Sequence, residues 1–467
     1  MASIHKQISL EERREFLKKV GQAGVGFGVL GMSLANQNFL REAYGVQQTN
    51  PFYDCALQIF YAGAPSQTDT WDPKPGSANK GPFNSINLGI KDKYNEDIRI
   101  SDVFPTIAAK VQNDPAVSIG IVRSMTHRNN AHGTAQEYMN NFWEGVPATL
   151  YPSTAAVMNY YFQGYGIGIP AVVINGGNGQ AANVSKASRC PTALQVGVGQ
   201  GQGANPTVQA LSMPAGVDQA RYMRRKSLLD KLNARYLAQR PDAITKAYEK
   251  ATNDATDVTI KGDAAKAFDL TGVPLVGTNN TAQQTRQRLT LAARLLEAGI
   301  PYVSTAITAV SNDTHGSNRA NIQQNWGEGF DKGVGDLIDR IKASGKKCLL
   351  WAGGEFGRTP NTVANGRDGR DHWGDGFSWV FISINQPKFK TNAIGQTGPD
   401  GMFEDRRGNL VDPVHPRDFG AIVYRSLGFQ VGTDVAYDVP LNDREAPPVD
   451  RMNIGKAIME DVFGLKP

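Results

Sequence analysis

Short apolar runs alternate with longer amphipathic stretches along most of this 467-residue chain. The runs are rich in β-branched and aromatic residues and occupy positions 56–61, 116–122, 171–174, 302–306, 348–351 and 379–384. Continuous apolar runs of this length are typical of strands buried on both faces. The pattern therefore predicts a mainly parallel sheet.

Two stretches between the runs carry apolar residues at helical spacing. Residues 281–298 and 329–344 each place them on one face, and Gly299 and Gly345 are suited to end these helices. Strands that alternate with helices predict a doubly wound α/β domain, with the sheet flanked by helices. Such sheets bind ligands beyond the carboxyl ends of their strands.

Two further stretches differ in composition from this pattern. Residues 176–206 are rich in Gly, Asn, Gln and Ser, which indicates a long loop. Residues 207–270 are predicted to form a helical insertion, because 217–249 are highly charged and carry leucines on one side. Pro241 is expected to divide this insertion into two helices.

The N-terminal 45 residues have the features of an export signal. Arg13 and Arg14 precede Phe16 and Leu17, and a weakly hydrophobic, glycine-rich stretch follows. This order predicts a twin-arginine-type leader over residues 1–45 and a periplasmic or secreted protein. A retained amphipathic helix is the alternative. No run of eighteen apolar residues occurs elsewhere, so no transmembrane span is expected beyond the leader.

Composition narrows the range of partners. With 40% hydrophobic and 20% charged residues the chain is ordinary globular material. The net charge of +5 is small for this length, and no dense basic run occurs, so no nucleic-acid partner is expected. Cys55, Cys190 and Cys348 form no C-x-x-C pair and predict no disulfide framework.

Histidines and acids gather in loops that follow the predicted strands. Three of the six histidines, His132, His315 and His372, lie in such loops. Other loops carry Asp69 and Glu355. Because the carboxyl ends of parallel strands meet at one edge of a sheet, we expect a single site there.

The residue types predict metal chemistry at this site. The expected ligands mix carboxylates and imidazoles: Asp69, Asp313, His315, Glu355 and His372. Such a mixture suits zinc, manganese or iron, with zinc or manganese expected here. Calcium and magnesium, which prefer all-oxygen sites, are the alternatives. Arg358 is suited to clamp an oxyanion, and His132 and Thr134 lie at the start of a predicted helix, where anions bind.

Each of these residues has a simpler interpretation by itself. Asp69 also suits a turn in which its carboxylate bonds the local backbone. His132 is equally suited to be a helix cap or a structural histidine, and Arg358 to pair with a surface carboxylate.

Five motifs, taken in order, resemble those of the domain-of-unknown-function 1501 family. They are Gly63-Ala-Pro-Ser-Gln-Thr-Asp69-Thr-Trp-Asp-Pro73, Arg123-Ser-Met-Thr-His127 with His132, Asp313-Thr-His315, Gly353-Gly-Glu-Phe-Gly-Arg-Thr-Pro360 and Gly369-Arg-Asp-His372. The resemblance covers residues 52–465. That family is similar to the alkaline phosphatase and sulfatase superfamily, which implies an alkaline phosphatase-like α/β domain over 50–467 with one or two metals.

The resemblance also implies residue roles. Asp69 resembles the ligand after the first strand, Asp313 and His315 the middle pair, and His372 the late histidine ligand. Glu355 stands where an Asp-His pair is usual. The attacking group is Thr134 or a metal-activated water, and His132 is either a ligand or a nucleophile.

Two functions follow, because the motifs also depart from the superfamily. The middle pair here is Asp-x-His instead of Asp-x-x-x-His, and Phe356 follows Glu355. The first function is an exported metal-dependent hydrolase of phosphate or sulfate esters. The alternative, which the departures favour, is a non-catalytic binding or assembly protein with a degenerate site and an envelope protein partner. A third possible function is that of a carbohydrate-binding or surface-layer component.

Overall fold

The computed structural model describes residues 52–142, 144, 153–162, 168–175, 193–198, 206, 217–239, 263–307, 313–361, 368–386, 388–389, 392–401 and 413–428. The chain divides into two compact units. The larger comprises Val46–Thr207 and Ala267–Pro467, and the smaller Met1–Gly45 and Val208–Lys266. The leader predicted over residues 1–45, Cys190 and Pro241 lie outside the described residues.

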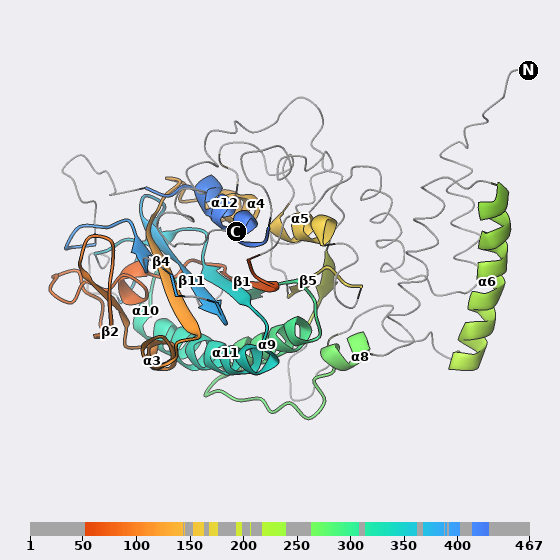
Figure 1. Cartoon of the computed structure of the whole chain (residues 1–467). Coiled ribbons are helices and arrows are strands. Elements are labelled where there is room, and N and C mark those ends of the chain that lie inside the picture. The colour runs from red at the N-terminus through yellow and green to blue at the C-terminus, as the bar shows by residue number, and fades with distance from the viewer. Residues whose placement is uncertain are drawn as a thin grey trace, which may run out of the picture. The chain divides into compact units, whose positions relative to one another are not determined.

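An eight-stranded sheet forms the centre of the larger unit (Figure 1). Its strands, in sheet order, are β12 (Ala393–Ile394), β4 (Val117–Met125), β11 (Phe377–Ile384), β8 (Cys348–Gly353), β1 (Cys55–Tyr61), β7 (Tyr302–Ile307), β5 (Ala171–Ile174) and β6 (Leu194–Val196). Only β11 runs antiparallel to its neighbours. The expected mainly parallel sheet is confirmed.

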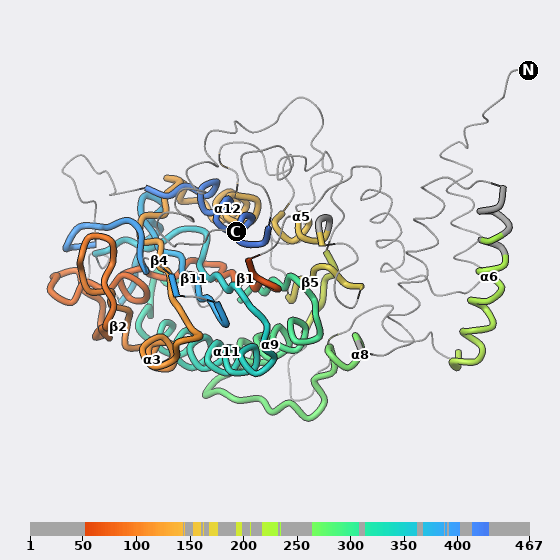
Figure 2. Tube along the Cα trace, in the orientation of Figure 1, coloured from red at the N-terminus to blue at the C-terminus, as the bar shows by residue number. Residues whose placement is uncertain are grey.

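The first strand lies in the middle of the sheet. β1 pairs with β7 on one side and β8 on the other, and Figure 2 shows it in red among strands coloured green to blue. All residues of these three strands are buried, which explains why they appear in the sequence as continuous apolar runs. Cys55 lies opposite Cys348 in this pairing, and both are buried free thiols.

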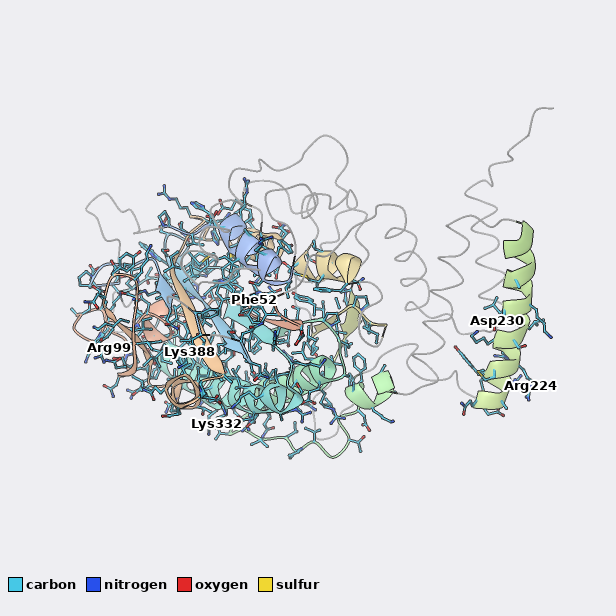
Figure 3. All side chains as sticks on the ribbon, in the orientation of Figure 1. Phe52, Arg99, Arg224, Asp230, Lys332 and Lys388 are labelled. Carbon is cyan, nitrogen blue, oxygen red and sulfur yellow. The ribbon has the colours of Figure 1, made fainter. Side chains whose placement is uncertain are left out.

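Helices cover both faces of the sheet (Figure 1). One face carries α3 (Pro105–Asn113), α9 (Asn280–Glu297) and α11 (Lys332–Ser344), and the other α4 (His132–Asn141), α5 (Thr154–Tyr161) and α12 (Pro416–Ser426). α9 begins where the Asn279 side chain accepts a hydrogen bond from the Ala282 amide. α11 ends at Gly345, whose φ of 72° is left-handed. Figure 3 shows Lys332 on the outer side of α11.

The helix predicted over 329–344 is longer in the structure. α11 continues a π-helix, η4 (Ile322–Asp331), which follows the short helix α10 (Asn318–Asn321). Trp326 of η4 stacks on Tyr61 at the end of β1, with ring centroids 3.6 Å apart. This long-range aromatic packing buries the segment that precedes the predicted helix.

Two small sheets were not predicted. β2 (Ser85–Lys91) pairs with β3 (Asp97–Ser101), and β9 (Gly357–Arg358) pairs antiparallel with β10 (His372–Trp373). The second pair places Arg358 opposite His372. The prediction of a continuous loop over 176–206 was wrong at β6, whose three residues extend the sheet beside β5.

The described part of the smaller unit is helical. It contains α6 (Gln219–Gln239), which lies within the predicted insertion 207–270 and carries the ion pair Lys226–Asp230 one turn apart. Arg224 and Asp230 are labelled on this helix in Figure 3. The chain passes from the smaller unit to the larger within α8 (Asp263–Phe268).

Candidate functional site

Loops from four strands bring histidines and acids to one edge of the sheet. His132, Asp313 and Glu355 follow β4, β7 and β8, which run parallel. His372 precedes β11 and not a parallel strand. Because β11 is reversed, its start lies at the edge where the parallel strands end, so His372 joins the other three.

Three of these side chains form a compact cluster. His132, Asp313 and His372 each offer one ligand atom, and these atoms lie within 4.8 Å of one another. Nε2 of His372 is 3.2 Å from Oδ1 of Asp313, and Nε2 of His132 is 3.3 Å from Oδ2. Among the described residues this is the one group with a metal-binding arrangement.

Glu355 lies behind His132. Its Oε1 accepts hydrogen bonds from Nδ1 of His132 at 2.6 Å, the Gly63 amide at 2.8 Å and Nε2 of Gln136 at 3.1 Å. A carboxylate accepts from Nδ1–H, so in the neutral imidazole the Nε2 atom that faces Asp313 carries a lone pair. The hydrogen bond to Glu355 also raises the pKa of His132 above its ordinary value. Glu355 therefore contacts a cluster residue and does not enter the cluster itself.

His372 is oriented in the same way by a backbone group. Its Nδ1 lies 2.8 Å from the carbonyl oxygen of Asn130, which can only accept. Nε2 of His372 therefore also presents a lone pair to the cluster. Burial lowers the pKa of His372, which favours the neutral imidazole that a metal needs.

Asp313 owes its ionisation to Arg358. Burial alone would raise the pKa of Asp313, but the hydrogen bond from Arg358 and its charge outweigh burial and lower this pKa to about 2. Nη2 of Arg358 lies 2.5 Å from Oδ1 of Asp313. Asp313 is thus a carboxylate at neutral pH.

Arg358 is buried, and its guanidinium donates hydrogen bonds to other groups of the protein. Its Nε donates to the carbonyl of Ala64 at 3.1 Å, Nη1 donates to that of Arg370 at 3.3 Å, and Nη2 also donates to that of Gly63. These bonds join the loops after β1, β7 and β8 and the segment before β11. The geometry gives Arg358 a role in positioning Asp313 in place of the expected clamp on a substrate oxyanion.

Asp69 lies outside the cluster. Its carboxylate is buried and accepts hydrogen bonds from Nε of Arg370 and from the side-chain Nδ2 of Asn318, both at 2.7 Å. The space beside it is filled so closely that a Cβ on Gly81 would lie 1.5 Å from Oδ1. The structure therefore places this expected ligand in a buried ion pair.

Thr134 does not face the cluster. His132 and Gln136, four residues apart on α4, both contact Glu355 and so define the side of the helix turned to the site. Thr134 is two residues from each, about 200° around the helix, and is exposed. The start of α4 is nevertheless open to an anion, because its N-cap residue Ala131 provides no side-chain hydrogen bond.

Some contributors could not be recognised from the sequence. Asn130 acts through its carbonyl and Gly63 through its amide, and backbone contacts leave no mark on residue type. Gln136 was detectable in principle, because it follows His132 by one helical turn. Asp371 lies inside a recognised motif and contacts His315, with Oδ1 2.8 Å from Nδ1.

The cluster fits a divalent cation. Nε2 of His132 and Oε2 of Glu355 are buried without a hydrogen-bond partner among the described residues. Two imidazole nitrogens with a carboxylate oxygen are donors that bind zinc and manganese well. A metal-binding histidine usually donates its other ring N–H to an oxygen acceptor, which fixes the orientation of the ring. The Glu355 carboxylate and the Asn130 carbonyl are these acceptors for His132 and His372.

The fold and the cluster define an α/β protein with a histidine–carboxylate centre at the strand ends. The chain belongs to the family described as "Protein of unknown function (DUF1501)", whose model matches residues 54–436. No curated protein matched the chain.

The solved structures with a similar chain path include the following three. Streptococcus pyogenes phosphoglycerol transferase GacH, with sn-glycerol-1-phosphate, shares 11% identity at a TM-score of 0.34, over 97% of this chain and 94% of that one. The zinc complex of the C-terminal periplasmic domain of EptC from Escherichia coli shares 10% sequence identity at a TM-score of 0.35, and the match covers 91% of this chain and 97% of that one. Alkaline phosphatase from the Antarctic bacterium TAB5 shares 8% sequence identity at a TM-score of 0.31, and the match covers 73% of this chain and 92% of that one.

Proposed function

We propose that this chain is a metal-dependent hydrolase of phosphate or sulfate esters. The observation that carries the proposal is the convergence of His132 Nε2, Asp313 and His372 Nε2, each within 4.8 Å of the others. His132 and His372 are fixed by acceptors behind them, so both lone pairs point to one place. Sites with preset donors at strand ends are suited to chemistry on an anionic ester.

His132, Asp313 and His372 would hold the cation, with zinc or manganese favoured by the nitrogen and oxygen donors. When bound, it would polarise the ester and offset the charge that develops on the leaving oxygen. Arg358 keeps Asp313 ionised through a charge-assisted hydrogen bond and holds its carboxylate in place.

The remaining groups of the site act on the anion. The backbone amides in the first turn of α4 adjoin His132 and are suited to donate hydrogen bonds to ester oxygens. Because Thr134 faces away from Glu355 and the cluster, the geometry favours water as the attacking group. The substrate class is thus a monoanionic or dianionic ester whose oxyanion is shared between the cation and these amides.

A binding protein without turnover is the second candidate. It is favoured by one observation: Asp69, the expected ligand after the first strand, is held by Arg370 and Asn318. A single cluster without this residue lacks the two-cation arrangement that would hold both the attacking and leaving oxygens. Such a protein would have a degenerate site that holds an anion, a metal or neither, and it would bind an envelope partner.

The experiment is metal analysis of the purified full chain with turnover assays on aryl phosphate and aryl sulfate esters. We expect one equivalent of zinc or manganese, and a His372→Ala variant that loses both metal and turnover by about 100-fold. His415→Gln, a partly exposed histidine bonded to Glu144, is the matched control. Metal without turnover would select the binding protein, and protein that takes up no metal would overturn the metal-dependent hydrolase.

Export through the twin-arginine route is proposed separately, from the leader sequence alone. Among the described residues, none of the helices is long and apolar enough to cross a membrane. Cell fractionation of an Arg13→Lys, Arg14→Lys variant tests the route. Retention of the variant in the cytoplasm, with wild-type protein outside it, is the expected result, and equal export of both would contradict it.

A further inference from the structure

The larger unit contains a cavity that is lined by none of the cluster residues. Its volume is about 540 Å³, within the range of about 300 to 1,000 Å³ that is usual for small-ligand sites. It lies between the loop after β1, the β2–β3 hairpin, Arg123 of β4 and the loop after β12. The loop after β1 contributes residues 72–77, so the end of the first sequence motif lines this cavity and not the cluster.

Two ion pairs form the buried side of the cavity. Nζ of Lys74 lies 3.0 Å from Oδ1 of Asp72, and the Thr397 hydroxyl donates to Oδ2 of the same carboxylate. Nη2 of Arg123 pairs with Asp92, whose carboxylate is fully buried. Both cations are thus neutralised inside the protein, and an anion that entered the cavity would compete with a carboxylate already in place.

The two paired cations keep hydrogen-bond donors for a ligand. The Lys74 ammonium has three N–H donors, and its acceptors among the described residues are Asp72 and the Thr397 carbonyl, at 3.4 Å. The Arg123 guanidinium has five, and within the described part of the chain it uses Nε on the Gly395 carbonyl, at 3.0 Å, and Nη2 in its ion pair. The buried side therefore offers N–H groups without offering a free positive charge.

The exposed rim offers acceptors and apolar surface. Glu96 and Asp97 are exposed carboxylates of the hairpin, and Nη2 of Arg99, a residue labelled in Figure 3, lies 3.8 Å from Oδ2 of Asp97. Gln396 adds a side-chain amide, which both donates and accepts. Three proline rings also line the cavity, namely Pro73, Pro75 and Pro399.

Hydroxyl groups suit such a lining, because each donates one hydrogen bond and accepts up to two. A sugar ring carries several hydroxyls on its edge and C–H groups on its faces, and the C–H groups can pack on proline rings. Its hydroxyls can accept from Lys74 and Arg123 and donate to the rim carboxylates without breaking either ion pair. We propose that this cavity binds a neutral sugar unit of a glycan. The inference goes beyond the proposed function and does not depend on it.

The walls of the cavity are held by hydrogen bonds of the protein itself. The Ser77 amide donates to the Lys74 carbonyl at 3.0 Å, which closes a turn at the side of the cavity. Nδ2 of Asn79 donates to the Asp400 carbonyl at 3.1 Å, which joins the loop after β1 to the loop after β12. A site that is already formed loses little conformational entropy when a ligand binds.

Gly76 allows a variant that fills the cavity without disturbing its walls. It lines the cavity, and a Cβ built on it meets no atom within 4 Å, so Gly76→Leu is sterically allowed. Gly197, which follows β6, is the matched control. It is exposed like Gly76, its Cβ also meets no atom within 4 Å, and it does not line the cavity.

Isothermal titration calorimetry of the full chain in the presence of EDTA tests the proposal. The probes are neutral hexasaccharides of glucose, mannose, galactose, xylose and N-acetylglucosamine. We expect at least one to bind the wild type and Gly197→Leu equally, and to bind Gly76→Leu about 10-fold more weakly or worse. Gln396→Ala should weaken the same sugar about 2- to 10-fold, the effect of one lost hydrogen bond.

Three outcomes would overturn the inference. Equal sugar affinities of Gly76→Leu and Gly197→Leu would mean that the sugar binds elsewhere. Binding of none of the five sugars would exclude the ligand class. Binding of inorganic phosphate or sulfate that Gly76→Leu abolishes would identify an anion site instead. Because EDTA keeps metal from the cluster, each result is independent of whether the proposed hydrolase is correct.

Discussion

Glu355 and His132, 223 residues apart in the chain, are joined by a hydrogen bond of 2.6 Å between Oε1 and Nδ1. The bond determines which nitrogen of His132 carries a proton, and so turns the Nε2 lone pair toward Asp313. It also connects the loop after β8 to the start of α4. The centre thus depends on a residue that does not belong to it.

Replacing Glu355 with glutamine tests this dependence. Gln is close in size, but a neutral amide no longer strengthens His132 as a ligand, so zinc affinity should fall about 10- to 100-fold. Isothermal titration calorimetry of the stripped chain measures the change. Glu328→Gln, on the exposed ion pair with Lys332, serves as the control. Equal zinc affinities in both variants would contradict the role given to Glu355.

Asp69 should matter for stability and not for metal content. Asp69→Asn leaves Arg370 buried without its counter-charge, which typically costs about 3 to 5 kcal/mol of unfolding free energy. Urea denaturation measures this loss, and metal analysis of the folded variant should give the wild-type stoichiometry. A variant that keeps its stability but loses a metal equivalent would restore Asp69 as a ligand.

Arg358 should be needed for the fold around the centre. Arg358→Met removes the donor to the Gly63, Ala64 and Arg370 carbonyls and leaves them buried, so the unfolding free energy should fall by about 3 kcal/mol or more. Asp313→Asn should cost less, because Asp313 is about a third exposed. The two are compared by denaturant titration, and the reverse order of stabilities would refute this assignment.

Thr134 is expected to be dispensable for turnover. Because it lies on the side of α4 away from Glu355, Thr134→Ala should keep turnover of aryl esters within about twofold of the wild type. Steady-state kinetics provides the measurement, and rapid-quench analysis looks for a covalent ester on the protein. A variant inactive but fully metal-loaded would identify Thr134 as the nucleophile.

The burial of His127 predicts that the protein loses stability in mild acid. Burial lowers the pKa of His127 below its ordinary value of 6.5, so the folded state binds fewer protons than the unfolded state just below that pH. Its contribution is full above pH 6.5 and is lost as the pH falls toward the folded pKa. Protonation would also break the hydrogen bond that Nδ1 accepts from the Asn129 amide.

The measurement compares urea unfolding of the wild type and His127→Gln at about pH 7.5 and about pH 5.5. The wild type should lose more free energy between the two pH values than the variant does. The comparison with the variant removes the opposite contribution of His132, whose pKa is raised. Identical pH dependence of the two proteins would show that His127 does not titrate as its burial requires.

Much of the fold could be predicted from the sequence, because strands buried on both faces consist of continuous apolar residues. The six predicted runs correspond to β1, β4, β5, β7, β8 and β11, with ends that differ by at most three residues. The short strands β6 and β12 escaped because two or three residues are too few to show a pattern. The reversal of β11 is a property of the connection, which the strand's composition does not encode.

The sequence by itself predicted the edge of the sheet at which the histidine and carboxylate cluster lies. Apolar runs define parallel strands, and polar residues after such strands must meet at one edge of the sheet. Tertiary structure decided which of those residues meet. Arg370 holds Asp69 in an ion pair outside the cluster, and Glu355 orients His132 toward the cluster. Both pairings depend on the directions and distances of side chains in three dimensions. Local sequence carries no record of those directions.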